Sequence, residues 1–525
     1  MLNVRPRRSD VLECVWLLFV ATSSTLWCLT AAQALGATFD EPDYVQWGLE
    51  HWRTGSVQKL MKFGTMPLVV DLQTLPLFVW ERWRGFPLDP TRDLEWALPW
   101  ARAMTLLFWW TLLIYAWRAG RQLAGLWGGG LAATLLACEP IFLAHASLAT
   151  SDVAVTACLL ALFVEFQASR DRKWPRRIAL PAVLFGIAIL VKASGLAFGL
   201  IGLVAVELER AIKAGPPLQH WKSNLARLHK FLIPFWRDLA VIIAGGLAIV
   251  FIYCPEAGAG LSEQVRHNFG GHAAYLLGKA YRTGTWYYFP VAFTVKTSLF
   301  LLLLPVIVRL VHRGVLWNWA TLGTVGLLLF SVTCRVQVGV RLMLPLLALG
   351  VVGLAAAAVH AWQGSQSQSK RIFLCAWIVG GIFSNSVVAT KIWPEALCYT
   401  NIAWGGTRNG YRWLSDSNYD WGQGLKELRS WQEQRGVDAV DVWYFGRDPA
   451  VHRLPLRELP LHAPERLAGL SVSEAVKGKC VAVSATLLHG PYLSRSKSGR
   501  EAVDFFRKLQ PSDRTMTFFI YEFPR

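Results

Sequence analysis

Charged side chains stand at the ends of long apolar runs in this sequence, where several of them could share one site. A charged side chain inside hydrocarbon costs about 2.5–3.5 kcal/mol even on lenient scales, so charges at one end of several membrane helices are expected to share an aqueous cavity. Carboxylates and cations in one cavity suit a substrate that has an anionic phosphate and a hydroxyl group to be deprotonated. Three carboxylates and three cations occupy such positions: Asp40, Glu41, Asp152, Lys192, Lys296 and Arg341.

The composition places these residues in a membrane protein. Of the 525 residues, 54% are hydrophobic and 17% are charged, whereas a soluble domain has roughly 25% charged residues. The apolar residues fall in long uninterrupted blocks, which excludes a soluble enzyme, a disordered protein and a disulfide-rich secreted scaffold. The net charge of +18 would otherwise suggest nucleic acid. Most basic residues lie in short loops between apolar blocks, so membrane topology explains them and no nucleic-acid partner is expected.

The apolar blocks predict an all-α polytopic membrane protein with about eleven transmembrane helices. The first block, from Val11 to Leu35, is too long for the apolar region of a signal peptide and is interpreted as an uncleaved first helix. The other ten spans are expected near residues 97–117, 124–143, 148–168, 178–192, 194–208, 232–253, 290–310, 316–333, 342–360 and 372–390.

The distribution of Lys and Arg among the loops predicts the orientation. With a cytoplasmic N-terminus, the basic loops all fall inside the cell: 118–121, 170–177, 209–230, 309–313 and 370–371. The outer side then receives residues 36–96, the tail from 391, and the short segments that carry the charged candidates. We expect a multi-pass protein of the bacterial inner (plasma) membrane with a periplasmic C-terminal domain. The lack of any Asn-x-Ser/Thr sequon favours a bacterial source.

Two of the outer segments are larger than connectors. In the first, residues 36–96, two stretches predict amphipathic helices that lie in the membrane interface. Four tryptophans are expected there at headgroup depth: Trp47, Trp52, Trp80 and Trp83. The tail alternates helical and extended patterns, which predicts a small α/β domain outside the membrane. The chain is thus divided into a membrane domain, 1–390, and an outer domain, 391–525, in which a Cys398–Cys480 bridge is left open.

Several stretches carry a resemblance to a known family. They are the Asp40-Glu41 pair after the first span, the turn from His145 to Asp152, Lys192, the stretches Tyr275-Leu-Leu-Gly and Trp286-Tyr-Tyr-Phe-Pro-Val-Ala-Phe-Thr-Val-Lys-Thr297, and Leu414-Ser-Asp-Ser-Asn-Tyr-Asp-Trp-Gly-Gln-Gly424. In position and order they resemble the membrane glycosyltransferases of the GT-C class. Within that class, they are similar to a bacterial branch of glycosyltransferase family 39. This family is the group of protein mannosyltransferases and aminoarabinose (ArnT-like) transferases.

The resemblance implies a GT-C-like membrane domain and an inverting glycosyltransferase. Such an enzyme moves a sugar from a polyprenyl-phosphate-linked donor to a lipid, glycan or protein acceptor on the outer face of the membrane. Its partners would be that donor, that acceptor and membrane lipids. The amphipathic helices of 36–96 would form the rim where the lipid enters, and the tail would recognise the acceptor.

Within this interpretation, Asp40 is the general base that takes the proton of the acceptor hydroxyl, because a single displacement needs one base. A lipid phosphate is already a good leaving group, so it needs cations rather than a proton. Lys192 and Arg341 are the main candidates for donor phosphate binding. Glu41 and Asp152 would hold Asp40 in place or bind a divalent cation, and the need for a metal is left open. Three further groups would support phosphate binding: Lys296, Arg266 and His272.

Each of these residues also has a structural interpretation. Asp40 and Glu41 could be solvated acids at a helix exit, and Asp152 could cap the next helix. Lys192 and Lys296 could be anchors that reach the membrane boundary. Arg341 could pair with lipid phosphates, and His145 and His272 could be structural hydrogen-bonding groups.

Two functions are considered as alternatives to the transferase: a transporter or flippase for lipid-linked or anionic solutes, and a non-catalytic envelope assembly factor. Transporters place functional charges near the membrane midplane and show internal symmetry. Here the charges lie at one face and no internal repeat is visible, which favours the enzyme.

Overall fold

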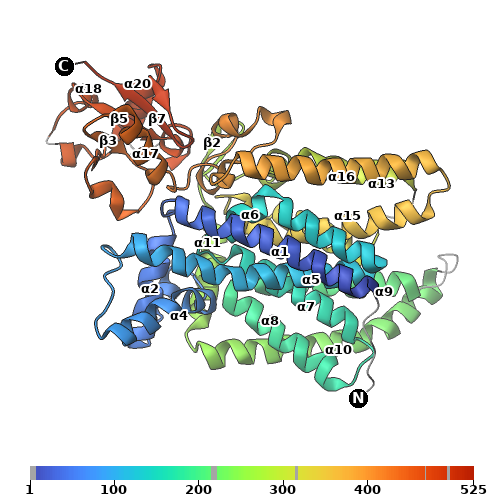
Figure 1. Ribbon diagram of the computed structural model, residues 1–525. Helices are drawn as coiled ribbons and strands as arrows, with labels where there is room; N and C mark the ends of the chain where they lie inside the picture. The colour runs from blue at the N-terminus through green and yellow to red at the C-terminus, as the bar shows by residue number, and fades with distance from the viewer. Residues whose placement is uncertain (1–7, 215–220, 314–316, 468, 493–496, 525) are drawn as a thin grey trace.

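Long helices lie side by side in the computed structural model, and a small domain caps one end of them (Figure 1). The structure describes residues 8–214, 221–313, 317–467, 469–492 and 497–524. Within these ranges, six helices are long and apolar enough to cross a membrane. These spans correspond to α1 (Arg8–Ala34), α5 (Leu94–Cys138), α7 (Asp152–Ser169), α10 (Trp221–Tyr253), α15 (Leu344–Gly364) and α16 (Gln368–Lys391).

A seventh span is formed if a broken pair of helices is counted as one. Helix α12 (Tyr288–Lys296) and helix α13 (Leu299–Val311) pass the same test together but are bent by 100° at the break. The remaining expected spans are also helical, but they are shorter or charged. They are α8 (Leu180–Val191), α9 (Gly195–Ala214), which ends in charged residues, and α14 (Trp319–Ser331). The predicted polytopic helical architecture is confirmed.

Helix α5 contains two of the expected spans because the chain reverses within it. The backbone leaves helical geometry at Ala124 and Gly125, and Gly125 has a φ of +71°, which glycine adopts at little cost. Beyond this point the helix runs back along itself. A Cβ added to Gly120 would lie 2.2 Å from the carbonyl oxygen of Gly128, so only glycine fits at this approach. Small residues therefore set the spacing of the two limbs, as in close helix packing within membranes.

The first large loop folds into α2 (Glu41–Thr54), α3 (Gln58–Lys62) and α4 (Pro67–Arg84). The predicted amphipathic helices are present, but they are tied to the bundle by a buried carboxylate. Asp71 accepts hydrogen bonds from His51 Nδ1 at 2.7 Å and from the Tyr253 hydroxyl of α10 at 2.7 Å. Trp47 is buried against the protein and stacks on Phe63 at 4.8 Å between ring centroids.

The tail forms a five-stranded sheet with helices, which confirms the predicted α/β domain. The strand order is β4-β3-β5-β7-β6; β3 is parallel to β4 and β5, and β7 is antiparallel to both of its neighbours. Cys398 and Cys480 are both free thiols. The strands are β3 (Val440–Trp443), β4 (Leu456–Glu458), β5 (Cys480–Ser484), β6 (Asp513–Arg514) and β7 (Phe518–Glu522), and the helices are α17 (Leu425–Arg435), α18 (Val472–Val476), α19 (Ala485–Leu488) and α20 (Lys497–Arg507).

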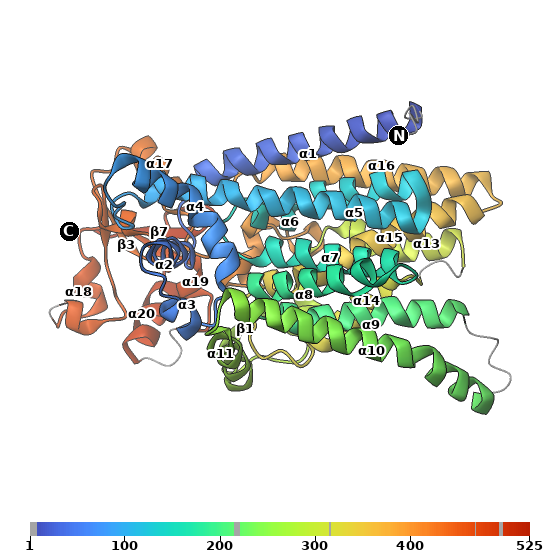
Figure 2. The ribbon, with the colours of Figure 1, turned by 90° about the horizontal axis from the view of Figure 1, so that it is seen from below.

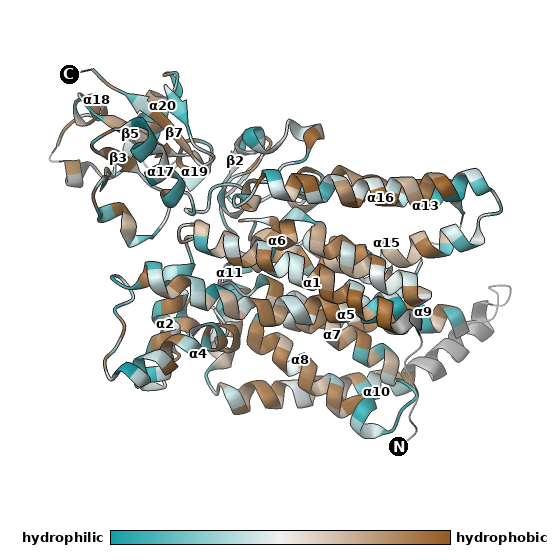
Figure 3. Cartoon of the chain, in the orientation of Figure 1, coloured by the Kyte–Doolittle hydropathy of each residue, from teal (hydrophilic) through white to brown (hydrophobic). Residues whose placement is uncertain are grey.

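The tail and the first large loop lie at the same end of the helical bundle (Figure 2). At this end are also α6 (Pro140–Ala146), α11 (Ala257–Gly270) and the hairpin of β1 (Ala274–Leu276) and β2 (Lys279–Tyr281). Hydrophobic residues dominate the long helices, and hydrophilic residues gather on the tail and the loops (Figure 3). All the segments that carry the charged candidates therefore meet at one end of the molecule.

Candidate active site

Four charged residues from four separate parts of the chain come together between the bundle and the tail. Asp40 precedes α2 and Asp152 is the first residue of α7. Lys192 follows α8, where the chain breaks before α9, and Arg341 lies in a short 3-10 helix, residues 340–343, ahead of α15. Each residue stands where a helix begins or ends, which brings all four to the same level.

Arg341 is the centre of this array. Its Nη2 donates to Asp40 Oδ2 at 3.1 Å, and its Nη1 donates to Asp152 Oδ2 at 3.5 Å. Its Nε donates to the Ser417 hydroxyl at 3.1 Å, and the guanidinium lies 4.0 Å from the centroid of the Trp421 ring. The side chain is 11% exposed. One cation thus links two carboxylates and the tail.

The two carboxylates differ in their surroundings. Asp152 is fully buried and holds both cations, since its second oxygen accepts a hydrogen bond from Lys192 Nζ. Asp40 is 26% exposed, and its Oδ1 accepts no hydrogen bond from any residue that the structure describes. Asp152 is therefore a fixed counter-ion, whereas Asp40 has one oxygen available to a substrate.

Lys192 also has capacity left for a ligand. Its side chain is 21% exposed, and an ammonium group has three N–H donors. Only the bond to Asp152 is made within the described part of the chain. Lys192 and Arg341, which both bond to Asp152, thus each keep N–H groups that no residue in the described ranges accepts.

The tail supplies a wall of the site that sequence reasoning did not include. Ser417 and Trp421 contact Arg341, and Asp416 lies beside them, where it accepts a hydrogen bond from the Tyr492 hydroxyl. Burial raises the pKa of Asp416 to about 7, although the nearby Arg341 opposes this. The Leu414–Gly424 stretch was part of the family resemblance in the sequence, but no function was predicted for its individual side chains.

Glu41 does not join the array. Its carboxylate accepts hydrogen bonds from Arg102 Nε at 2.8 Å and Nη2 at 2.6 Å, and from the amides of Thr38 and Ala149. Burial alone would raise its pKa, but Arg102 and these amides together hold the pKa below its ordinary value. Glu41 is fully buried and fully bonded, so it fixes the loop that carries Asp40 and presents no oxygen to a substrate.

Lys296 is buried beneath the tail. Its Nζ donates to the carbonyl oxygens of Leu397 at 2.7 Å, Tyr399 at 2.5 Å and Asn418 at 2.7 Å. All three donors of the ammonium group are thereby used. Lys296 therefore binds the tail to the end of α12 and is not free to bind a donor phosphate.

The two supporting residues that were expected from α11 and its end lie elsewhere. Arg266 is exposed and pairs with Glu263 one turn earlier on the same helix, at 2.5 Å. His272 Nδ1 donates to the carbonyl oxygen of the adjacent Ala273 at 3.0 Å. His145 is buried, and burial lowers its pKa to about 3, so it is neutral at pH 7. None of the three contacts the four-residue array through a hydrogen bond or ion pair in the described ranges.

The carboxylates do not fit a divalent cation. Glu41 is satisfied by Arg102, and Asp152 is satisfied by Lys192 and Arg341. No group of three or more His, Cys, Asp or Glu side chains with the geometry of a metal site occurs among the residues that the structure describes. We therefore derive no step of the chemistry through a metal ion.

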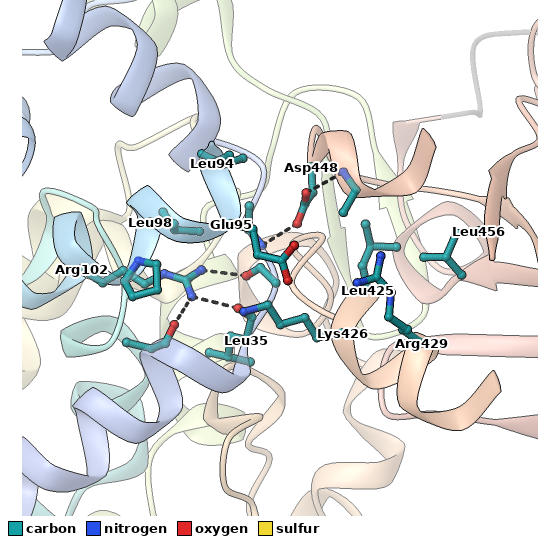
Figure 4. Close-up of a pocket in the computed structure, with 15 residues that line it drawn as sticks. Leu35, Leu94, Glu95, Leu98, Arg102, Leu425, Lys426, Arg429, Asp448 and Leu456 are labelled. Atoms are coloured by element: carbon teal, nitrogen blue, oxygen red, sulfur yellow. Dashed lines mark hydrogen bonds between the residues drawn. The ribbon is translucent and has the colours of Figure 1, made fainter. Parts of the chain in front are cut away.

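A pocket lies where the bundle meets the tail (Figure 4). It lies between the end of α1, the start of α5 and α17. Arg102 donates to the carbonyl oxygens of Ala32 at 2.7 Å and Gly36 at 2.7 Å. Asp448 accepts from the amide of Ala37 at 3.0 Å, and Lys426 donates to the Gln33 carbonyl at 2.7 Å. These polar groups already bond to one another or to the backbone. The bonds of Asp448 and Lys426 connect the tail to the bundle at this pocket.

Comparisons with known proteins find similar solved structures, among them two of one protein. No family model and no curated protein sequence matches the chain. The crystal structure of ArnT from Cupriavidus metallidurans bound to undecaprenyl phosphate is 13% identical, with a TM-score of 0.44 over 96% of this chain and 97% of the other. The apo form of the same protein is 14% identical, with a TM-score of 0.43 over 97% of both chains. Similarity at this level gives no information about substrates.

Proposed function

We propose that the protein is an inverting membrane glycosyltransferase that moves a sugar from a polyprenyl-phosphate donor to a hydroxyl of an acceptor. The observation that carries the proposal is the array itself. One carboxylate with an open oxygen is bonded to a cation, and a second, buried carboxylate holds that cation and another one. This arrangement offers a base and an anion site side by side, which a transfer from a phosphate to a hydroxyl requires.

The donor phosphate would bind to the unused N–H groups of Lys192 and Arg341. The acceptor hydroxyl would donate its proton to Oδ1 of Asp40 while its oxygen attacks the anomeric carbon. The bond from that carbon to the phosphate oxygen breaks, and its electron pair stays on the departing polyprenyl phosphate. A single attack opposite the leaving group inverts the configuration.

The ion pair between Asp40 and Arg341 couples the two halves of this step. Before the reaction, Arg341 shares its charge between Asp40 and Asp152. As Asp40 takes up the proton it loses its charge, so Nη2 of Arg341 is released to the phosphate oxygen at the moment when negative charge develops there. Charge stabilisation that appears in the transition state is the kind that accelerates a reaction.

The first test compares donor turnover by the wild-type protein and the Asp40→Asn variant in nanodiscs, with a panel of polyprenyl-phosphate sugars and a membrane extract as acceptor. Loss of one positioned base is expected to lower turnover by about 10²–10⁴-fold. The matched control is Asp89→Asn, an exposed acid in the same loop, which should turn over normally. Equal activity of wild type and Asp40→Asn would remove Asp40 from the chemistry.

We further propose that the array faces the periplasm and that the opposite end of the bundle is cytoplasmic. The basic loops support this, since they lie at the end away from the tail. Single cysteines at Asp89 and at Asp171, both exposed, would report the two ends. The background should lack the exposed Cys14 and Cys375. An impermeant maleimide should label Asp89→Cys in cells whose outer membrane alone is permeabilised, and should label Asp171→Cys only after lysis of the inner membrane.

Labelling of Asp171→Cys before lysis would reverse the proposed orientation. If the wild-type protein binds a polyprenyl-phosphate sugar but releases no polyprenyl phosphate with any acceptor, the transferase proposal fails. Flux of that lipid across a sealed bilayer would then distinguish a flippase from an assembly factor.

A further inference from the structure

Residues of the tail complete the cation site of the membrane domain. Arg341 belongs to the membrane part of the chain, yet two of its four side-chain contacts come from the tail, 76 and 80 residues further along. Its Nε donates to the Ser417 hydroxyl at 3.1 Å, and its guanidinium lies over the Trp421 ring at 4.0 Å. The Trp421 side chain is itself almost fully buried, so the ring is a fixed surface.

The segment that carries these two residues is fixed at several points. The Asn418 side chain accepts a hydrogen bond from the amide of Val340 at 3.0 Å and donates to the Tyr288 hydroxyl at 2.9 Å. The Asn418 carbonyl accepts from Lys296 at 2.7 Å, and the Trp421 carbonyl accepts from the amide of Phe39 at 2.8 Å. The segment therefore touches the residues next to both Arg341 and Asp40.

The guanidinium needs this support because its two acidic partners do not define its plane. The bond to Asp152 is 3.5 Å long, and Asp40 must be able to give up its bond when it takes a proton. A ring face and a hydroxyl on Nε hold the group in one orientation regardless of the state of Asp40. A cation over the face of a tryptophan is attracted by the ring, and more strongly when the pair is desolvated.

We infer that Trp421 and Ser417 are positioning residues for donor phosphate binding, acting through Arg341, so that the tail is part of the donor site. This inference rests on the proposed function. It differs from the expectation that the tail serves the acceptor, because it assigns to the tail an effect on the donor.

The test is a double-mutant cycle on the affinity for polyprenyl phosphate, measured with the full-length protein in nanodiscs. The variants are Trp421→Leu, Arg341→Met and the two combined. Trp421→Leu is expected to weaken binding by about tenfold, whereas Trp421→Phe, which keeps an aromatic face, should lose less than threefold. The double variant should bind no more weakly than Arg341→Met alone, because Trp421 acts only through that guanidinium.

The matched control is Trp443→Leu. Trp443 is fully buried in the tail, where it packs on Phe506 and donates to His462, and it does not contact Arg341. If Trp443→Leu weakens binding as much as Trp421→Leu, the effect is general loosening of the tail and the inference is wrong. Additive losses in the double variant, or unchanged binding by folded Trp421→Leu, would also overturn it.

The cycle separates this inference from the proposed function. A wild-type protein that binds no polyprenyl phosphate overturns the proposed function and the inference together. A wild-type protein that binds the lipid while Trp421 and Arg341 act independently overturns the inference alone. Ser417→Ala should produce a smaller loss than Trp421→Leu, of about threefold, because a single neutral hydrogen bond is removed.

Discussion

At the scale of single residues, the array separates a carboxylate that is fixed from one that is free to react. Asp152 is fully buried, and two cations satisfy it. Asp40 is partly exposed and keeps one oxygen open. Sequence position predicts that both are helix-end acids, but only the fold decides which is enclosed, because enclosure depends on what the tail and the neighbouring helices cover.

The buried pair of Asp152 and Lys192 gives a prediction that separates stability from binding. In Lys192→Met, the Asp152 carboxylate keeps only the 3.5 Å bond to Arg341, so the variant should lose about 3–5 kcal/mol of stability. It should also bind polyprenyl phosphate about 10–100-fold more weakly. Adding Asp152→Asn removes the unpaired charge and should restore the thermal unfolding temperature, but not the affinity. Recovery of affinity in the double variant would show that Lys192 serves only to neutralise Asp152.

The candidate residues also show where sequence reasoning ends. The placement of Asp40, Asp152, Lys192 and Arg341 at helix ends was sufficient to group them. The same reasoning grouped Lys296 with them, because a lysine that ends an apolar run looks the same whether it faces a cavity or a protein surface. Its three acceptors are 101 to 122 residues away in sequence, and no local pattern indicates contacts at that separation.

At the scale of elements, breaks in helices do most of the positioning. The 100° bend between α12 and α13 places Ser298 against the buried Glu139, whose carboxylate accepts from the Ser298 amide at 2.9 Å and from Asn385 Nδ2 at 2.9 Å. Hydropathy predicts such segments as helical spans but does not report the bends, since a bent apolar helix and a straight one have the same composition. The bend between α12 and α13, the reversal within α5 and the short or charged helices α8, α9 and α14 together make the number of long spans smaller than the number of apolar blocks.

The reversal within α5 gives a prediction for an element. In Gly128→Ala, the new Cβ would lie 2.4 Å from the Gly120 carbonyl oxygen, so the two limbs must move apart and the yield of monodisperse protein should fall severalfold. In Gly130→Ala, two residues away, the nearest atom to the new Cβ is 3.8 Å distant, an ordinary contact. That variant should purify and unfold like wild type in a size-exclusion and thermal-unfolding comparison. Similar yields for both variants would contradict the close packing of the limbs.

At the scale of the whole molecule, the tail contains buried carboxylates that accept hydrogen bonds from other residues of the tail. Asp420 is buried and accepts hydrogen bonds from the amides of Thr486 at 3.0 Å and Gly422 at 3.2 Å, with no cation bonded to it in the described residues. Burial raises its pKa to about 7. Alternating patterns in the sequence predicted the strands of this domain, but its docking surface joins residues from both halves of the chain and could not be predicted.

The stability of the tail should depend on pH in a defined direction. Because the pKa of Asp420 is raised on folding, the folded state binds more protons than the unfolded state between about pH 4 and pH 7, and stability falls as the pH rises through that window. The thermal unfolding temperature should therefore drop by a few degrees between pH 5 and pH 8. Asp420→Asn should reduce the slope without removing it, because burial also raises the pKa of Asp416 to about 7 and that of Glu395 to about 8. A temperature that rises over this interval would contradict the prediction.

The bonds between Lys296 and the three tail carbonyls have a consequence for biosynthesis. A chain grows from its N-terminus, so every membrane helix leaves the ribosome before residues 397–418 do. Until those residues are synthesised, Lys296 lacks its three carbonyl acceptors. Arg341 likewise lacks the Trp421 ring and the Ser417 hydroxyl. The helical bundle is thus inserted before its charged site is complete. Translation of the last quarter of the chain supplies the residues that complete the site.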